Sequence, residues 1–171
     1  MTRQPTVAII GTGRDAEPAV SNARKLGQLV AENGWVLITG GRNAGVMKAA
    51  NEGAKEVDGS LTIGILPNGD AEVSPAVDVA IVTDTGEARN NVIVLSADVV
   101  IACGVDGAGT ASEVALAINN GKHVILLNAD DGASRFFTGI GGKSIHAANS
   151  PEDAIATVVR FLETRPLITD P

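Results

Sequence analysis

Short apolar runs rich in β-branched residues alternate along the chain with longer segments of helical periodicity. This alternation predicts an α/β fold in which parallel strands are joined by crossover helices. The runs are apolar on both faces, as a mainly parallel sheet flanked by helices requires. The expected strands are Thr6 to Ile10, Val36 to Thr39, Leu61 to Leu66, Val79 to Val82, Val99 to Ala102 and Val124 to Leu127.

The segments between these strands carry helix boundary signals. Asn33-Gly34 and Asn120-Gly121 are typical helix stops, because asparagine and glycine tolerate the left-handed conformation. Ser150 before Pro151 predicts a capped start for a last helix that serves packing. The expected helices run from about Pro18 to Asn33, Ala44 to Val57, Glu87 to Ser96, Thr110 to Asn120 and Pro151 to Thr164.

The chain has the size of one domain. Its 171 residues, 44% of them hydrophobic and 19% charged, are enough to bury a core, so residues 1–171 are predicted to form a single domain. The longest polar break is the loop from Pro67 to Pro75. This loop either covers the mouth of a site or is a surface excursion between strands.

A glycine-rich junction, Gly104 to Glu113, joins the buried strand at Val99 to a helix. Backbone amides in such a loop approach a phosphate closely, and the helix adds its unpaired N–H groups and positive dipole end. The candidate ligand-binding residues here are Gly107, Ala108, Gly109 and Thr110. The alternative is that the glycines only let the helix pack against the sheet.

A second junction, from Trp35 to Ala50, repeats this design and offers Gly40, Gly41, Arg42 and Asn43. Two such junctions on one sheet predict a phosphate-bearing ligand of nucleotide size. Gly11, Thr12 and Gly13 are also candidate binding residues, but Ala16 stands where the dinucleotide fingerprint needs its third glycine, so NAD is not expected. No Gly-Lys-Ser/Thr follows any loop, which argues against P-loop chemistry.

Two charged residues are the main candidates for chemistry. Arg89, at a helix start, either binds phosphate through two guanidinium N–H groups or is an exposed arginine paired with Glu87 or Asp84. The same two interpretations apply to Arg42, as a phosphate ligand or as an exposed arginine. Glu113 either closes a capping box with Thr110 or acts as an acid or base beside the loop, and these roles are compatible. Cys103, His123 and His146 are expected to be structural.

Composition limits the partners and the metal chemistry. A net charge of −7 and 2% aromatic residues argue against nucleic acid, whereas a small anion needs only local donors. One cysteine and two histidines cannot form a four-ligand zinc set, so no protein metal site is expected and any metal arrives inside a ligand. Without an apolar run of about 18 residues or a signal peptide pattern, the sequence predicts a cytoplasmic protein with no membrane segment.

Several motifs in order resemble the molybdenum cofactor carrier proteins, within a wider Rossmann-like group that includes the Lonely Guy enzymes, long misannotated as lysine decarboxylases. The motifs are Thr39-Gly40-Gly41-Arg42 to Val46-Met47, Ile63-Gly64-Ile65-Leu66-Pro67, Ala76-Val77-Asp78-Val79, Gly86-Glu87-Ala88-Arg89-Asn90, Gly107-Ala108-Gly109-Thr110-Ala111-Ser112-Glu113 to Ala117, and Arg135-Phe136-Phe137-Thr138. The resemblance covers nearly the whole chain.

The resemblance implies a single doubly wound, Rossmann-like domain that assembles as a homodimer or homotetramer. It also implies that the protein binds molybdenum cofactor across the glycine loops, protects it and transfers it. This cofactor is a pterin phosphate that holds molybdenum through its own dithiolene sulfurs. Molybdoenzymes or cofactor-biosynthesis proteins would then be the protein partners. No catalytic residue is expected in a carrier of this kind.

The Lonely Guy enzymes imply an alternative, because their pocket hydrolyses the N-glycosidic bond of a nucleoside 5′-monophosphate with an arginine and a glutamate. Those residues match Arg89 and Glu113 here. Val105 and Asp106 replace a proline and a glycine of the enzyme motif, and Asn90 replaces a lysine. Asp106 would repel a dianion unless it points away or is offset by Arg42 or Arg89. A third reading is a nucleotide-binding module without catalysis.

Overall fold

The computed structural model describes residues 3–163, which form a seven-stranded sheet in which every neighbouring pair is parallel. The strand order β4-β3-β2-β1-β5-β6-β7 reverses direction between β1 and β5, as in doubly wound folds. The strands are β1 (Thr6–Gly11), β2 (Val36–Thr39), β3 (Thr62–Leu66), β4 (Val79–Val82), β5 (Val99–Cys103), β6 (His123–Leu127) and β7 (Ile145–Ala148).

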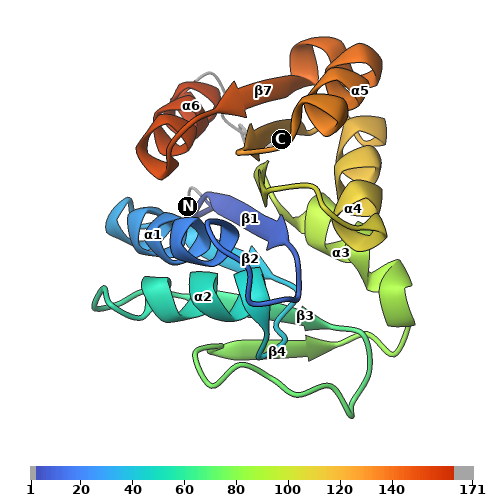
Figure 1. Cartoon of the computed structure of the whole chain (residues 1–171). Coiled ribbons are helices and arrows are strands. Elements are labelled where there is room, and N and C mark those ends of the chain that lie inside the picture. Colours follow the sequence, from blue (N-terminus) through green and yellow to red (C-terminus); the bar gives the residue numbers. More distant parts are fainter. Residues whose placement is uncertain (1–2, 164–171) are drawn as a thin grey trace, which may run out of the picture.

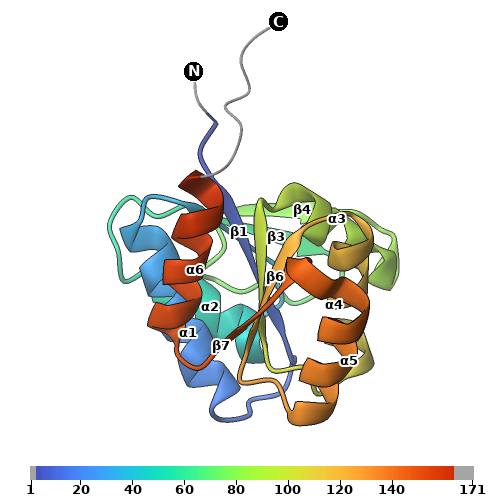
Figure 2. The ribbon, with the colours of Figure 1, turned by 90° about the horizontal axis from the view of Figure 1, so that it is seen from above.

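Helices cover both faces of the sheet (Figures 1 and 2). One layer is α1 (Ala19–Glu32), α2 (Gly45–Ala54) and α6 (Pro151–Glu163), and the other is α3 (Arg89–Ser96), α4 (Ala108–Asn119) and α5 (Asp131–Gly141). Short 3-10 turns, η1 (Gly86–Ala88) and η2 (Gly142–Ser144), complete these elements. No helix in residues 3–163 combines the length and the apolarity of a membrane span.

The sheet divides the core into two clusters because successive side chains of a strand point to opposite faces. Along β1, Val7 and Ile9 join the cluster beneath α1, α2 and α6, whereas Ala8 and Ile10 join the cluster beneath α3, α4 and α5. Central strands with two apolar faces are therefore a direct consequence of the doubly wound arrangement.

The α/β fold and the predicted strands and helices are confirmed, with small shifts at their ends. The helix stops at Asn33 and Asn120 are C-caps, each followed by a glycine with positive φ, and Ser150 Oγ accepts the Asp153 N–H at 3.1 Å. The prediction missed α5 and β7. Thr164, the expected end of the last helix, lies outside the described residues.

Helices α1 and α2 approach each other so closely that two glycines are needed at their contact. A Cβ at Gly27 would overlap the carbonyl oxygen of Ala50, and a Cβ at Gly53 would overlap that of Arg24. Backbone atoms cannot move aside as side chains do, so this contact fixes the spacing of the two helices behind β1 and β2.

We expect Gly27→Ala to lower the melting temperature, because overpacking of this kind typically destabilises by about 1–3 kcal/mol despite the better helix propensity of alanine. The matched control is Gly139→Ala in α5, where a Cβ would meet no heavy atom within 4 Å and stability should stay equal or rise. The melting temperatures of both variants and of the wild type are measured by scanning calorimetry. A Gly27→Ala protein as stable as the wild type would contradict the close contact.

Candidate functional site

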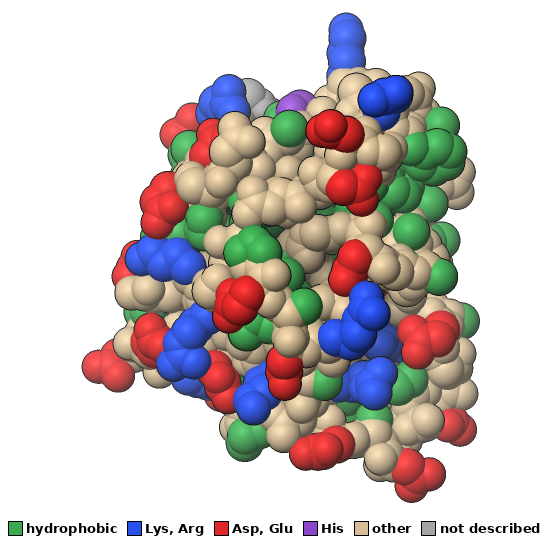
Figure 3. Space-filling model, viewed as in Figure 1, with side chains coloured by type: hydrophobic (Ala, Val, Ile, Leu, Met, Phe, Trp, Pro, Cys, Tyr) green, Lys and Arg blue, Asp and Glu red, His purple; other side chains and the backbone are tan. Residues whose placement is uncertain are grey.

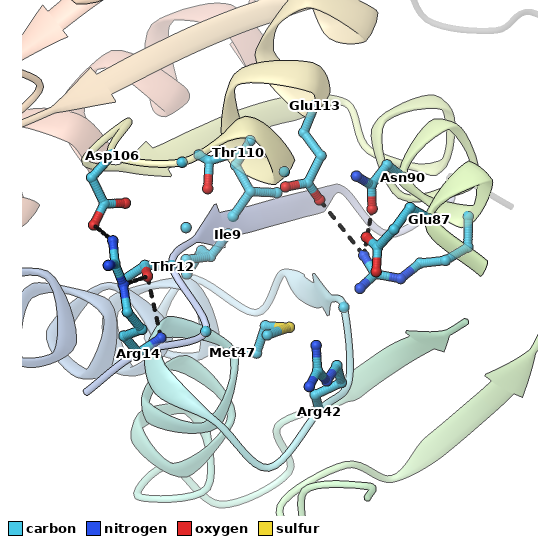
Figure 4. A pocket seen from close by; sticks show the side chains of 17 residues that line it. Ile9, Thr12, Arg14, Arg42, Met47, Glu87, Asn90, Asp106, Thr110 and Glu113 are labelled. Atoms are coloured by element: carbon cyan, nitrogen blue, oxygen red, sulfur yellow. Dashed lines mark hydrogen bonds and ion pairs between the residues drawn. The ribbon is translucent and has the colours of Figure 1, made fainter. Parts of the chain in front are cut away.

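A cavity of about 440 Å³ opens where the carboxyl ends of β1, β2 and β5 meet, at the point where the strand order reverses (Figure 4). This is the usual ligand position in an open α/β sheet, and the volume lies in the range of about 300–1,000 Å³ typical of small-molecule sites. We call it the anion cavity. It is lined by Ile9, Ile10, Gly11, Thr12, Gly13, Arg14, Gly40, Arg42, Met47, Glu87, Arg89, Asn90, Asp106, Gly107, Gly109, Thr110 and Glu113.

The start of α4 presents backbone donors to this cavity. Gly107 is the N-cap, and the first intrahelical bond runs from the Ala111 N–H to its carbonyl at 3.0 Å. The N–H groups of Ala108, Gly109 and Thr110 therefore have no acceptor inside the helix. A Cβ at Gly107 or Gly109 would meet no heavy atom within 4 Å, so the approach to these amides is open.

Several backbone amides of the second glycine loop already have partners inside the protein. Gly41 N–H donates to Thr39 Oγ1 at 3.0 Å, and Asn43 N–H donates to the Glu72 carbonyl at 2.9 Å. At the start of α2, Val46 N–H donates to the Thr12 carbonyl at 3.0 Å. Three donors of this junction are therefore occupied, whereas the first-turn N–H groups of Gly45 and Met47 in α2 have no acceptor inside the helix. The pair of anion-binding junctions stays a prediction.

Arg89 is buried in the wall of the cavity, with 5% of its surface exposed, so the reading as an exposed surface arginine is wrong. Its Nη1 donates to Asn90 Oδ1 at 2.6 Å and lies 3.9 Å from Glu113 Oε1, while its buried Nε has no partner in the described part of the chain. Gly40 provides the room, because a Cβ there would lie 3.1 Å from Nη1. The guanidinium is a preformed cation with an unused donor.

Glu113 projects from α4 toward Arg89 and is buried, with 6% of its surface exposed. Burial raises the pKa of its carboxyl group from 4.5 to about 8, the Arg89 charge lowers it and the Glu87 charge adds to the rise. The capping-box reading is wrong, because α4 begins two residues before Thr110 and no side chain caps it. At neutral pH, Glu113 is therefore mainly a neutral acid inside the anion cavity.

The raised pKa of Glu113 makes stability depend on pH. The proton binds more tightly in the folded state, so the contribution is complete below the unfolded pKa of 4.5 and is lost as pH rises through about 8. We expect the unfolding free energy of the wild type relative to Glu113→Gln to fall between pH 5 and pH 9, by at most about 1.4 kcal/mol per pH unit. Urea unfolding of both proteins across this range makes the comparison, and parallel curves would refute it.

Arg14 and Asp106 form an ion pair of 3.0 Å that links the loop after β1 to the loop after β5 (Figure 4). Asp106 was expected to repel a dianion unless it points away or is offset by Arg42 or Arg89, and in the structure its carboxylate pairs with Arg14. The sequence analysis missed Arg14, although its position directly after Gly11-Thr12-Gly13 at a strand end was an available signal. With Arg42 and Arg89, it is one of three arginines in a lining that also contains Glu87, Asp106 and Glu113.

Most predicted binding residues meet in the anion cavity. Those that line it are Gly11, Thr12, Gly13, Gly40, Arg42, Arg89, Gly107, Gly109, Thr110 and Glu113. Gly41 and Ala108 do not line it, and Asn43 lines a neighbouring cavity together with part of the loop from Pro67 to Pro75. Sequence reasoning missed Ile9, Ile10, Arg14, Met47 and Glu87 as lining residues and considered Asn90 and Asp106 only as departures from a motif.

The remaining reactive side chains are packed into the fold. Burial raises the pKa of the Cys103 thiol to about 12, so it stays protonated. His123 stacks on Phe161 with ring centroids 3.8 Å apart and its Nδ1 lies 3.3 Å from His146 Nε2. Burial lowers the pKa of both imidazoles. In residues 3–163 no three His, Cys, Asp or Glu side chains gather as a metal site.

Comparison with known proteins places the chain in a family. Residues 4–155 match the model of the SLOG cluster4 family. The molybdenum cofactor binding protein from the phototrophic bacterium Rippkaea orientalis is 51% identical, with a TM-score of 0.89 and coverage of 94% of this chain and 98% of that chain. The molybdenum cofactor carrier protein of Chlamydomonas reinhardtii is 44% identical, with a TM-score of 0.90 and coverage of 95% and 100%.

A protein of Archaeoglobus fulgidus without assigned function is 43% identical over 121 residues, which are 71% of this chain and 78% of that protein. The similarities to the two structures extend over nearly the full length of each protein compared. They confirm the resemblance identified from the sequence motifs.

Proposed function

The chain belongs to the SLOG cluster4 family and to the molybdenum cofactor carrier proteins, and from this premise we propose that it binds molybdenum cofactor, protects it and transfers it. The observation that carries the proposal is the anion cavity itself. Open amides at the start of α4 face the same space as the buried Arg89. The cofactor is here the cargo of the protein and not a catalytic group.

The cavity suits the phosphate of the cofactor. The helix dipole and the N–H groups of α4 favour a negative charge, and Arg14, Arg42 and Arg89 add cations around it. The chain as a whole carries a charge of −7, and Figure 3 shows acidic and basic side chains interspersed on the face seen in Figure 1. Affinity for a phosphate therefore depends on local donors, while the overall charge mainly slows the encounter.

The residues present also suit a metal that arrives already bound. A cofactor whose metal is held by its own sulfurs needs no metal ligand from the protein. The dithiolene sulfurs of the pterin would keep the metal. The residues that would hold the cofactor are those that contact its phosphate and ring, with Gly107, Gly109 and Arg89 foremost.

Anaerobic loading and transfer test the proposal. We expect the purified protein to bind molybdenum cofactor saturably at micromolar concentrations, to slow its oxidation and to reactivate an apo-molybdoenzyme. Arg135→Met, at an exposed position of α5 away from the cavity, is the control variant and should behave as the wild type. Absence of saturable loading would refute the carrier function.

A second candidate function is favoured by one observation, the 3.9 Å approach of Arg89 Nη1 and Glu113 Oε1 in one cavity. In a nucleoside monophosphate hydrolase, Arg89 would hold the substrate. Glu113, with its pKa of about 8, would donate a proton to the departing base while water adds to the ribose carbon. Release of free base from AMP or an N6-substituted analogue, lost in Glu113→Gln, would support this activity. Binding of AMP with unchanged AMP recovered would instead support a nucleotide-binding module.

We also propose that the protein is a homo-oligomer. The edge strand β4 (Val79–Val82) is exposed along its whole length and carries only apolar residues, a combination that natural sheet edges avoid unless they are covered. Exposed Val92 and Leu95 lie on α3, which packs on the neighbouring β3. A second copy of the chain would cover this apolar surface, and light scattering of the purified protein tests for a dimer or tetramer.

The cytoplasmic location stays a prediction.

A further inference from the structure

A second cavity, of about 470 Å³, adjoins the anion cavity and shares Arg42 and Glu87 with it. Its wall contains Asn43 from the second glycine loop and Asp70 and Glu72 from the loop after β3. We call it the acidic cavity, because three carboxylates, those of Asp70, Glu72 and Glu87, line it. The anion cavity, with its open amides and arginines, and the acidic cavity thus lie side by side.

The two loops that form the acidic cavity are held together by backbone bonds. Arg42 and Val73 form an antiparallel bridge, and Ser74 N–H donates to the Gly41 carbonyl at 2.9 Å. Asn43 N–H donates to the Glu72 carbonyl at 2.9 Å. The loop from Pro67 to Pro75 is therefore fastened beside the site, and the cavity is a formed part of the fold.

The side chain of Asn43 independently indicates that the acidic cavity binds a hydrogen-bond donor. Its Nδ2 donates to Glu72 Oε1 at 2.9 Å, which fixes the orientation of the amide. Its Oδ1 is buried and has no partner in the described part of the chain. A buried acceptor without a donor costs free energy. A ligand N–H that donates to Asn43 Oδ1 would remove this cost and so bind more tightly.

We propose that the acidic cavity holds an uncharged ring with several N–H donors, the aminopyrimidinone of a pterin, while the phosphate of the same ligand lies in the anion cavity. The inference rests on the proposed binding of a pterin phosphate and adds its orientation. Ionised carboxylates only accept hydrogen bonds, so they attract the ring amino and amide N–H groups and repel the phosphate. The open amides and Arg89 lie only in the first compartment, and Asp70, Glu72 and the free Asn43 oxygen lie only in the second, so the two ends of the ligand are distinguished.

The test compares two stable phosphate esters, neopterin 3′-monophosphate and glycerol 3-phosphate, by titration calorimetry. We expect the wild type to bind the pterin ester at least about 10-fold more tightly, which is the effect of one charge-assisted hydrogen bond. Asp70→Asn and Glu72→Gln should each weaken pterin ester binding by about 10-fold. Neither should weaken binding of glycerol 3-phosphate. Gln at position 72 still accepts the Asn43 bond, so the loop stays fastened.

Asp58→Asn, at an exposed position after α2, is the matched control and should bind both esters as the wild type does. Equal affinity of the wild type for the two esters, or unchanged pterin ester binding in both variants, would overturn the orientation while leaving phosphate binding intact. Failure of the wild type to bind either ester would overturn the proposed function together with this inference.

Discussion

The Arg89→Met variant is expected to lose affinity for neopterin 3′-monophosphate by about 100-fold or more, a loss of at least two charge-assisted hydrogen bonds. Arg89 is 5% exposed, and its buried Nε has no partner in the described residues. Its position is fixed before the ligand arrives, so little rotamer entropy is lost on binding. Titration calorimetry at constant ionic strength gives the affinity of each protein.

Removal of Arg89 should affect binding far more than folding. The guanidinium lowers the pKa of Glu113, so its loss lets Glu113 stay protonated and no buried charge is left unpaired. Arg89→Lys keeps the charge without the planar fork, and an intermediate loss of about 10-fold is expected. The control is Arg135→Met, which removes the same charge from an exposed position on α5. Equal affinities for Arg89→Met and the control would exclude Arg89 from the phosphate site.

The regular elements that position the site were predictable because they obey simple periodicities. Val99 to Cys103 is buried at every position, and an uninterrupted apolar run that begins with three β-branched residues predicts a central parallel strand. The elements that were missed lack such signals. Helix α5 contains Gly132, Gly139 and Gly141, and its start depends on the Asp130 side chain, which accepts the Ala133 N–H at 2.9 Å. Strand β7 is short, and only its first residue is a β-branched one.

The parts of the site that were not predicted depend on contacts between segments that are far apart in the sequence. Arg14 and Asp106 are 92 residues apart in sequence, and only the parallel pairing of β1 with β5 brings their loops together. The Thr12 carbonyl likewise accepts the Val46 N–H from a segment distant in sequence, and so occupies one of the first-turn donors of α2. A glycine-rich strand-to-helix loop predicts where donors are, but the neighbouring loop decides whether they stay open.

The glycines of the chain separate into two groups by what surrounds them. A Cβ at Gly27 or Gly45 would collide with backbone of another segment, so these residues serve packing. A Cβ at Gly107 or Gly109 would collide with nothing within 4 Å, although both line the cavity. Packing therefore gives no reason for glycine at these two positions. The approach of a ligand to the backbone does give one.

Gly109→Ala is accordingly expected to lower affinity for neopterin 3′-monophosphate by about 100-fold while leaving the protein equally stable or more stable. The added methyl group stands where the phosphate would approach the α4 amides, and losing two such bonds to a charged group accounts for a change of this size. Within α4, alanine is favoured over glycine by about 1 kcal/mol, so the melting temperature should not fall. Calorimetric titration and thermal unfolding of the same preparation measure both effects.

Gly139→Ala is the matched control, because it places the same methyl group in another helix, in open space and away from the cavity. Both variants should be at least as stable as the wild type, and only Gly109→Ala should lose binding. This combination separates a glycine kept for a ligand from one kept for folding. If Gly109→Ala bound the pterin ester as tightly as Gly139→Ala, the phosphate would not contact the start of α4. The anion would then have to be held by the arginine side chains alone.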